Sequence, residues 1–428
     1  MQPLRDNRRV LVASAMGTAV EYYDFFIYAT AAALVFGPLF FPAKDPATQT
    51  MLAFLSFGIA FIARPVGAVV FGHFGDRIGR KSTLVASLLL MGVSTLAIAV
   101  LPTHATSERW GIGWLAPALL CLMRFGQGMG LGGEWAGAAL LAIENAPPGW
   151  KARFGCVPQL GVPIGFMAAN GAFLVLGATL TPAEFTAWGW RIPFVLSAVL
   201  VVLGLWVRLK IEETLEFRHV LEHETVELVP IAAIWRHWRL LVAGSAGVIS
   251  TYALFYIAST FALSEATGVL NYPRQEFLAV QLVANLFLAV GIWMAGWNAD
   301  LSTPGRTLAL GAVVTMISGL VFWPALASGS LGLAALMLCI VNLGQGFNAG
   351  PLGSWLSPLL PARLRYTGVA FAFNVGGIVG GAVVPNLAQA LSKSGQNANV
   401  GGLLVLCGIV SLWGVLTTRN ATHYNKVN

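Results

Sequence analysis

Twelve long apolar segments, separated by short polar loops, constrain this chain more than any other feature of its sequence. They lie at residues 10–40, 51–75, 83–102, 113–143, 154–180, 190–208, 238–265, 275–298, 306–326, 330–356, 366–391 and 400–418. Each has about 20 residues or more, which as a helix crosses a hydrocarbon layer of roughly 30 Å. With 57% hydrophobic and 10% charged residues, the chain lacks the polar surface that a soluble domain needs. The predicted fold class is an all-α membrane protein with twelve transmembrane helices.

The chain divides into two halves with similar sequence patterns. A charged stretch at 209–237 is too polar to lie in lipid, and it separates six apolar segments in 1–208 from six in 238–428. Two patterns of the first half return in the second at nearly constant spacing: Arg124-Phe-Gly-Gln-Gly as Asn342-Leu-Gly-Gln-Gly, and Gly72-x-x-x-Asp76 as Gly296-x-x-x-Asp300. We therefore expect two six-helix bundles related by duplication and joined by a cytoplasmic linker, an arrangement typical of rocking transporters.

Basic residues are distributed unequally between the two sides of the predicted membrane. Loops on one side hold most of the 25 Lys and Arg residues; the other side carries only Lys44, Arg109, Arg274 and Lys393. The positive-inside rule then places both termini and the linker in the cytoplasm, in a multi-pass protein of the cell inner membrane. This topology explains the net charge of +7 without a nucleic-acid partner. The first segment is too long for a signal peptide, so we expect it to remain as a span.

The cysteines and histidines do not form a ligand set. The four cysteines all fall inside apolar segments without a C-x-x-C pair, as expected for small core residues. The six histidines lie in loops or tails, and only His219 and His223 have helical spacing. No G-x-x-x-x-G-K-[ST] sequence is present, so ATP-driven transport has no motif. We expect no metal, no cofactor and no enzymatic activity.

One loop matches a known signature. Between the second and third segments stands Gly72-His-Phe-Gly-Asp76-Arg77-Ile-Gly79-Arg80-Lys81, which matches the G-x-x-x-D-R/K-x-G-R-R/K loop of the major facilitator superfamily. Glycines permit a tight turn, and an aspartate at a helix end can accept hydrogen bonds from arginines or exposed amides, as a gate requires. The predicted gating residues are Gly72, Asp76, Arg77, Gly79, Arg80 and Lys81. The alternative is an ordinary basic loop. In the second copy no basic residue directly follows Asp300, which makes a gating role for Asp300 doubtful.

Five ionisable residues lie inside predicted spans: Glu21, Asp24, Arg64, Arg124 and Glu134. Each costs at least about 2.5 kcal/mol at the bilayer centre unless it is paired or hydrated. Asp24, Arg64 and Arg124 each lie near the middle of a span. Glu21 and Asp24 share a helix face, and two carboxylates that close do not both ionise easily in a low dielectric.

These five residues suggest two functions and one structural alternative. Asp24, Glu21 and Glu134 are candidates for proton coupling, because a carboxyl that takes up and releases a proton is what coupling requires. Arg124 and Arg64 are candidates for binding an anionic or zwitterionic substrate, since a guanidinium holds a carboxylate with two hydrogen bonds. The alternative is that the five form mutually neutralising ion pairs that hold helices together.

Polar residues of the second half are weaker candidates for substrate binding. Buried amides and hydroxyls can orient a substrate, but they also join helices in membranes. The candidates are Tyr252, Gln281, Asn285, Asn348 and Asn374, with Tyr256, Asn342 and Gln345 as further possibilities. The glycine-rich stretch 126–133 is expected to allow close helix packing and is not a phosphate loop.

Several motifs together resemble the metabolite:proton symporter branch of the major facilitator superfamily, which includes shikimate, alpha-ketoglutarate, citrate and proline/betaine permeases. They are Glu21-Tyr-Tyr-Asp24-Phe, Phe61-Ile-Ala-Arg64-Pro65-Val-Gly67, the 72–81 loop, Arg124-Phe-Gly-Gln-Gly, Gly132-Gly-Glu134-Trp135, Gly189-Trp-Arg191-Ile-Pro193-Phe, Arg365-Tyr-Thr-Gly368 and Asn374-x-x-Gly377-x-x-Gly380. The resemblance implies twelve helices, alternating access and proton symport, with Asp24 as the leading coupling acid and Arg124 as a leading substrate contact. The tail after the last span lacks a heptad pattern, unlike osmosensing betaine permeases with a C-terminal coiled coil.

Taken together, these features predict a monomer in membrane lipid that moves a small organic acid or zwitterion in symport with protons. Two alternatives stay open. The same fold could drive proton-coupled efflux of a metabolite or drug. More remotely, the chain could be a membrane-embedded enzyme or sensor, although it shows no metal cluster or nucleophile triad.

Overall fold

The computed structural model describes residues 7–43, 45–78, 80–209, 234–361 and 364–419, and these residues form helices and connecting loops without a strand. The helices of the first half are α2 (Arg8–Ala31), η1 (Ala32–Phe36), α3 (Gly37–Phe40), α4 (Pro46–Ile78), α5 (Arg80–Val100), α6 (His104–Glu108), α7 (Leu115–Glu144), α8 (Lys151–Gln159), α9 (Gly161–Thr179), α10 (Pro182–Ala187), η2 (Gly189–Arg191) and α11 (Ile192–Leu209). Those of the second half are η3 (Trp235–His237), α14 (Trp238–Tyr256), η4 (Ile257–Phe261), α15 (Ala262–Gly268), α16 (Arg274–Leu301), α17 (Pro304–Leu326), α18 (Leu331–Ala349), α19 (Leu352–Leu356), η5 (Ser357–Leu359), α20 (Arg365–Gly377), η7 (Ile378–Val383), α21 (Val384–Lys393) and α22 (Asn399–Thr417).

Each of the twelve predicted segments is helical, which confirms the fold class. Ten helical stretches are long and apolar enough to cross a membrane, and α5 adds a shorter apolar stretch at Val85–Val100. The remaining crossing is α7, whose 30 residues include several glycines, Arg124 and Glu134 and which is not among those ten stretches. Large apolar side chains such as Val93, Leu320 and Leu336 are exposed on the outer helix faces. This exposure is expected where lipid, not water, is the solvent.

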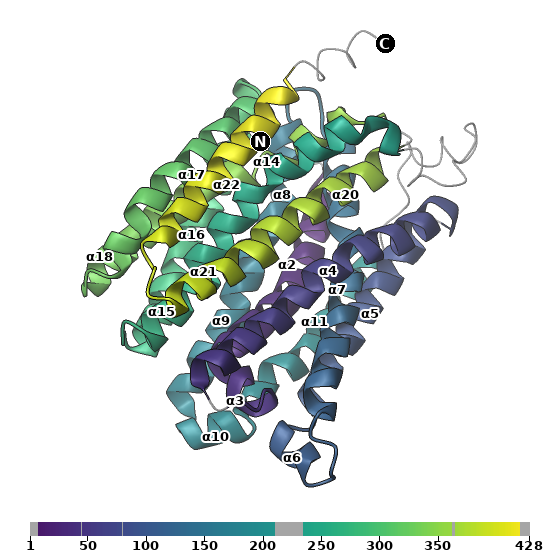
Figure 1. Ribbon diagram of the computed structural model, residues 1–428. Helices are drawn as coiled ribbons and strands as arrows, with labels where there is room; N and C mark the ends of the chain where they lie inside the picture. Colours follow the sequence, from purple (N-terminus) through teal and green to yellow (C-terminus); the bar gives the residue numbers. More distant parts are fainter. Residues whose placement is uncertain (1–6, 44, 79, 210–233, 362–363, 420–428) are drawn as a thin grey trace.

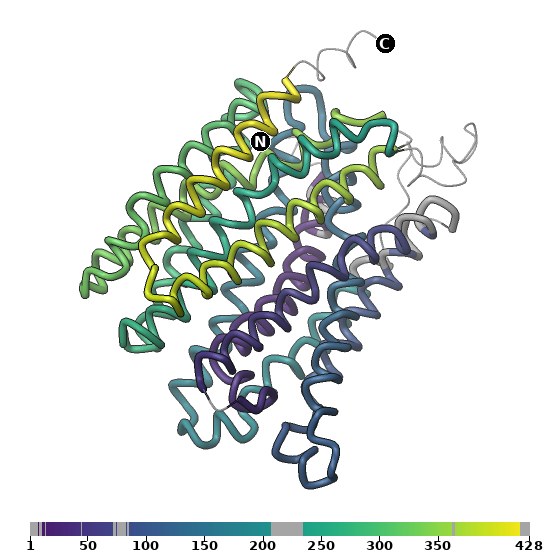
Figure 2. Tube along the Cα trace, viewed as in Figure 1, coloured from purple at the N-terminus to yellow at the C-terminus, as the bar shows by residue number. Residues whose placement is uncertain are grey.

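The helices form two bundles that lie side by side (Figures 1 and 2). In the first bundle α4 and α5 pack on α7, and α2 packs on α9; in the second, α16 packs on α18 and α17 on α22. Contacts between the bundles come mainly from α4 against α20 and η7, and from α16 against α8 and α9. The first described helix begins and the last one ends at the same end of the molecule (Figure 1). Most of the expected linker, 210–233, lies outside the described residues.

Close packing of α7 against α4 follows from glycines. A Cβ atom added at Gly128 or Gly132 would collide with the backbone of Ala60 or Arg64 on α4. Without side chains at these positions the two helix backbones approach closely, as small residues allow in membranes. This confirms the packing role expected for the glycine stretch. It also brings Arg64 and Arg124, on two different helices, to the same part of the bundle.

Candidate functional site

Two buried arginines lie against the same aromatic ring. Arg64 on α4 and Arg124 on α7 have 1% and 0% of their surface exposed. The guanidinium carbons of Arg64 and Arg124 lie 4.6 Å and 4.3 Å from the centre of the Phe25 ring on α2. A guanidinium over an aromatic face is attracted by the ring quadrupole. Phe25 therefore holds two cations near each other inside the first bundle.

Arg124 is surrounded mainly by rings. Its guanidinium carbon lies 4.2 Å from the centre of the Tyr28 ring and 4.9 Å from that of Phe57. Nη1 donates a 3.0 Å hydrogen bond to Oε1 of Gln127, and Nε donates a long one, 3.4 Å, to the Phe57 carbonyl. Nη2 has no hydrogen-bond partner among the described residues. Part of this cation's donor capacity is therefore available for an acceptor.

Arg64 faces the second bundle. Nη1 donates a 3.1 Å hydrogen bond to the Tyr252 hydroxyl on α14, and the Phe61 ring centre lies 4.6 Å from the guanidinium carbon. Nε and Nη2 have no hydrogen-bond partner among the described residues. Neither Arg64 nor Arg124 lies within 4.0 Å of a carboxylate of any described side chain. For these two residues, the described side chains do not form the structural ion pairs that were the alternative.

Asp24 is connected to Arg124 through two neutral side chains. Its Oδ2 accepts a 2.8 Å hydrogen bond from the Thr95 hydroxyl, which accepts one of 2.8 Å from Nε2 of Gln127. Oε1 of Gln127 accepts the 3.0 Å bond from Arg124. All four residues are at most 3% exposed. The structure thus brings the candidate acid and the candidate cation into one hydrogen-bonded network, without direct contact.

The other two candidate acids occupy different places. Glu21 lies one turn before Asp24 on α2 and is 1% exposed. Glu134 is 0% exposed but follows Arg124 by ten residues on α7, which is about 15 Å along a helix. Glu134 is therefore remote from Arg124 along α7, although Gly132, two positions before it, packs on the Arg64 backbone. Proton-coupling roles for Glu21 and Glu134 remain predictions.

The described residues of both bundles line two small cavities. The larger, about 40 Å³, is lined by Tyr22, Gln159 and Val162 of the first bundle and by Thr251, Tyr252, Phe255, Tyr256, Leu288, Ile292, Gln345, Ala349 and Phe373 of the second. The smaller, about 10 Å³, is lined by Phe26, Ala29, Thr30, Phe166, Asn170, Ser259, Thr260, Leu263 and Gln281. Both linings combine apolar side chains with amides and hydroxyls, as small-molecule sites do.

Aromatic side chains separate the arginines from the larger cavity. Rings of Phe25, Phe57 and Phe61 contact the Tyr256 ring at centroid distances of 6.0, 5.5 and 5.5 Å. Tyr252 belongs to both regions, because it lines the cavity and accepts the hydrogen bond from Arg64. Neither Asp24 nor Arg124 lines either cavity. Movement of these rings would be needed to join the arginine cluster to the cavity.

The second-half candidates divide into two groups. Tyr252 and Gln281 line the larger and the smaller cavity. Asn285, Asn348 and Asn374 are buried but line neither. Asn348 donates to Thr315 and to Gln345, and accepts from the Ser250 hydroxyl. Asn374 donates a 2.9 Å bond to the Gly132 carbonyl in the other bundle. The bonds of Asn348 and Asn374 are of the kind that join helices, and substrate roles for all five remain predictions.

The expected gating loop falls largely outside the described part of the structure. This holds for the surroundings of Gly72, for the side chains of Asp76, Arg77, Arg80 and Lys81, and for the whole of Gly79. Their gating role stays a prediction.

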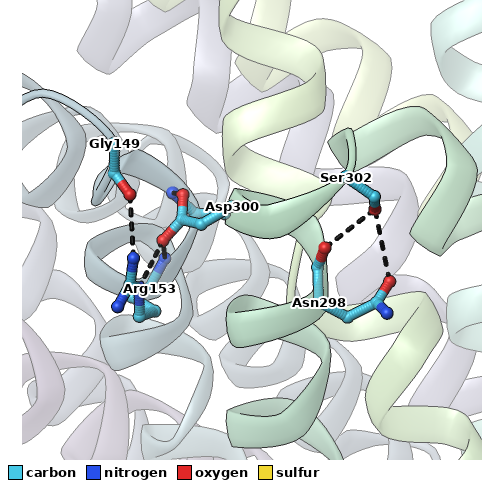
Figure 3. Close-up of polar contacts among 6 residues, drawn as sticks. Gly149, Arg153, Asn298, Asp300 and Ser302 are labelled. Atoms are coloured by element: carbon cyan, nitrogen blue, oxygen red, sulfur yellow. Dashed lines mark hydrogen bonds and ion pairs between the residues drawn. The ribbon is translucent and has the colours of Figure 1, made fainter.

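The second copy of that loop makes a contact that its sequence did not suggest. Asp300 on α16 forms a 2.6 Å ion pair with Arg153 on α8 and accepts the backbone N–H groups of Ala152 and Arg153 at 2.8 and 3.1 Å (Figure 3). The doubt about Asp300 rested on the residue that follows it, whereas its partner comes from the other bundle.

A second contact between the bundles lies at the opposite end of the helices. Nζ of Lys393, at the end of α21, lies 3.6 Å from Asp45 and 3.1 Å from the Thr48 hydroxyl at the start of α4. Lys393 and Asp45 are about half exposed, so this pair is weaker than the Arg153–Asp300 pair.

Sequence reasoning missed Phe25, Thr95 and Gln127. Gln127 carried a usable signal, because it follows Arg124 by three residues and therefore shares its helix face. Thr95 carried none, since a threonine in an apolar span is common and only the packing of α5 against α2 and α7 brings it to Asp24. Phe25 directly follows Asp24, yet its contact with two arginines depends on how three helices are rotated.

The chain is similar to transport proteins along nearly its whole length. Residues 10–226 match the family described as "Sugar (and other) transporter". The inner membrane metabolite transport protein YhjE of Escherichia coli (strain K12) is 44% identical over 98% of this chain and 96% of its own length. The shikimate transporter of the same strain is 35% identical, over 90% of this chain and 87% of its own length. A solved structure of the proton:xylose symporter XylE of E. coli has the same fold, with a TM-score of 0.74 at 14% identity over 96% of this chain and 95% of that one.

Proposed function

This chain belongs to the Sugar (and other) transporter family, and on that premise we propose that it moves a small organic acid together with protons across the inner membrane. The observation that carries the proposal is the pair of buried arginines at Phe25 with hydrogen-bond donors left over. In this proposal Arg64 and Arg124 bind the carboxylate of the cargo, meaning the transported solute. Asp24 is the coupling acid.

The free-energy cost of unpaired buried donors favours an anionic cargo over a purely structural role for the arginines. A buried donor without a partner costs about 1–3 kcal/mol, and Arg64 and Arg124 have three such nitrogens between them. Cation–π contacts with the surrounding rings contribute about 0.5–2 kcal/mol each but do not satisfy N–H groups. A carboxylate accepts several hydrogen bonds and neutralises the positive charge as well.

The cavities favour an acid over a zwitterion. A zwitterionic cargo needs a partner for its ammonium group, typically a carboxylate. The residues that line the two cavities include no Asp or Glu. Their amides and tyrosine hydroxyls suit hydroxyl or carbonyl groups of a compact cargo instead.

Proton coupling follows from the charge balance around Asp24. When Asp24 is ionised, it compensates Arg124 through Gln127 and Thr95. When Asp24 takes up a proton, Arg124 loses that compensation, so its affinity for an anion rises. By linkage, a bound anion favours protonation of Asp24 by the same factor. Proton and anion then bind and leave together.

Alternating access would use the contacts at the two ends of the bundle interface. Arg153–Asp300 lies at the end where basic loops predict the cytoplasm, and Asp45–Lys393 lies at the other. Rocking of the bundles would break one contact while the other holds. The residues of the 72–81 loop would assist at the cytoplasmic end. The basic-residue distribution supports cytoplasmic termini for this orientation.

Uptake into proteoliposomes tests the proposal. The probes are labelled shikimate, an anion suggested by one relative's name, and labelled glycine betaine, a zwitterion. With an alkaline interior we expect accumulation of shikimate or of another carboxylate in a small panel, and none of betaine. Asp24→Asn should lose accumulation and keep solute exchange. Accumulation by Asp24→Asn at the wild-type level, or a panel in which only zwitterions accumulate, would contradict the proposal. Export of preloaded solute in exchange for protons would favour efflux.

A further inference from the structure

We propose that Thr95 and Gln127 are positioning residues that transmit the protonation state of Asp24 to Arg124. The inference rests on the proposed function and names the side chains through which its two binding events are coupled. The path is Arg124 Nη1 to Gln127 Oε1 at 3.0 Å, Gln127 Nε2 to Thr95 Oγ1 at 2.8 Å, and Thr95 Oγ1 to Asp24 Oδ2 at 2.8 Å. We call this path the Thr95–Gln127 relay.

The polarity of the relay fits an ionised Asp24. Each link donates in the same direction, from the cation to the carboxylate, and such chains of hydrogen bonds strengthen one another. Gln127 and Thr95 are 3% and 0% exposed, so water does not compete for these bonds. The amide of Gln127 fixes the direction of donation along the relay, because its oxygen accepts from Arg124 while its nitrogen donates to Thr95.

Thr95 has a second acceptor, which makes it a switch. Its hydroxyl oxygen lies 2.9 Å from the Met91 carbonyl one turn earlier on α5, and 2.8 Å from Oδ2 of Asp24. The hydroxyl has one hydrogen, so it donates to one of these acceptors at a time. With Asp24 ionised, the hydrogen goes to the carboxylate. With Asp24 protonated on Oδ2, the acid donates to Thr95 and the Thr95 hydrogen turns to Met91.

This reversal of the Thr95 hydrogen bond removes the negative charge that compensates Arg124 through the relay. In the protonated state Thr95 accepts from both Asp24 and Gln127, so no negative charge remains at the end of the relay. The bond from Arg124 to Gln127 then weakens, and the guanidinium can turn toward an incoming carboxylate. The proton itself stays on Asp24 throughout, and the relay transmits only the direction of hydrogen bonds. Coupling therefore needs no direct contact between acid and cation.

Other groups around Asp24 do not offer an equivalent path. Glu21 and Tyr23 are the titratable neighbours on its own helix α2, and the Tyr23 hydroxyl donates to the Pro193 carbonyl at 2.8 Å. Ser197 is the neighbouring hydroxyl on α11. Arg124 on α7 is linked to Asp24 through Gln127 and Thr95, whereas Arg64 on α4 donates to Tyr252 and makes no hydrogen bond or ion pair with Asp24 among the described residues. The relay is thus the hydrogen-bonded connection that the described residues provide.

Infrared spectroscopy of the purified protein in lipid tests the relay without any cargo. The C=O band of protonated Asp24, identified by its loss in Asp24→Asn, is followed from about pH 5 to about pH 9. We expect Gln127→Met to move the pH midpoint of this band by at least about half a unit, although Gln127 does not contact Asp24. Thr95→Val should move it as well and also change the band frequency, and Thr95→Ser should restore both. Thr315→Val removes an equally buried threonine hydroxyl on α17 and should change neither.

The relay is overturned if folded Gln127→Met shows the same pH midpoint of the Asp24 C=O band as the wild type. If Gln127→Met does not fold, Gln127→Asn keeps the amide but shortens it by one methylene and serves the same comparison. The relay is also overturned if Thr315→Val moves the pH midpoint of the Asp24 band as far as Thr95→Val does. Loss of any buried hydroxyl would then be enough to cause the shift. Failure of the proposed function is separate, since it appears as Asp24-independent accumulation in the proteoliposome assay.

Discussion

Arg153 and Asp300, 147 positions apart in the chain, join the two bundles through a 2.6 Å ion pair between α8 and α16. The rings of Trp150 and Trp297 lie 3.7 and 4.9 Å from the Arg153 guanidinium carbon. The side chains of Arg153 and Asp300 are only 11% and 6% exposed. Breaking a buried pair by removing one partner is costly, about 3–5 kcal/mol, because the other charge stays behind. The pair therefore joins α8 to α16 at this end, and removal of Asp300 would leave the Arg153 charge without its partner.

We predict that Asp300→Ala opens this end of the molecule. Cys156 is buried on α8, and its sulfur contacts Gly296 on α16 and Gly350, so separation of the bundles exposes it. In a background where the other three cysteines are serine, labelling of Cys156 by N-ethylmaleimide should speed up at least about fivefold, equivalent to about 1 kcal/mol. Lys393→Ala breaks the contact at the opposite end and should not speed up labelling. Equal rates in Asp300→Ala and wild type would show that the pair does not hold the closed state.

We predict that Arg124→Lys lowers carboxylate uptake at least about tenfold. Lysine keeps the positive charge but loses the planar group that contacts Phe25, Tyr28 and Gln127 and can hold a carboxylate with two hydrogen bonds. Initial uptake rates in proteoliposomes measure the effect. Arg109→Lys makes the same exchange at an exposed loop position and should leave uptake unchanged. Wild-type rates in Arg124→Lys would mean that charge alone suffices there.

Tyr252→Phe should weaken cargo binding by roughly three- to tenfold in KM with a smaller change in kcat. The substitution removes the hydroxyl that accepts from Arg64 at 3.1 Å while the ring that lines the cavity remains. One hydrogen bond to a charged group contributes about 1.5–3 kcal/mol, part of which a rearranged Arg64 regains. The matched control is Tyr272→Phe, whose hydroxyl donates to the Leu326 carbonyl outside the site. A KM unchanged from wild type would place Tyr252 outside the binding path.

Gly132→Ala should destabilise the protein, whereas Gly171→Ala should not. An added Cβ at Gly132 would collide with the Arg64 backbone, but at Gly171 nothing lies within 4 Å. Overpacking of this kind costs about 1–3 kcal/mol, while alanine in an open helix position is favourable by up to about 1 kcal/mol. Thermal unfolding in detergent should show a lower midpoint for Gly132→Ala than for Gly171→Ala. The reverse order would mean that α4 and α7 separate easily.

The sequence by itself determined the membrane class and the twelve helices, because hydropathy and charge act locally along each segment. It also identified Asp24, Arg64 and Arg124 as ionisable residues whose place inside a membrane span is costly unless they are paired or hydrated. It did not predict the contact of Asp300 with Arg153, since the residue after an aspartate says nothing about a partner in the other half.

Only the tertiary structure decided which of these groups meet. The contact of both arginines with Phe25, and the link from Asp24 through Thr95 and Gln127, depend on the rotation and close approach of α2, α4, α5 and α7. Glycines permit that approach, but the rotation results from the packing of many side chains at once. Apolar segments of equal hydropathy can be rotated in many ways at the same cost in lipid, so no pattern in one segment specifies its partners.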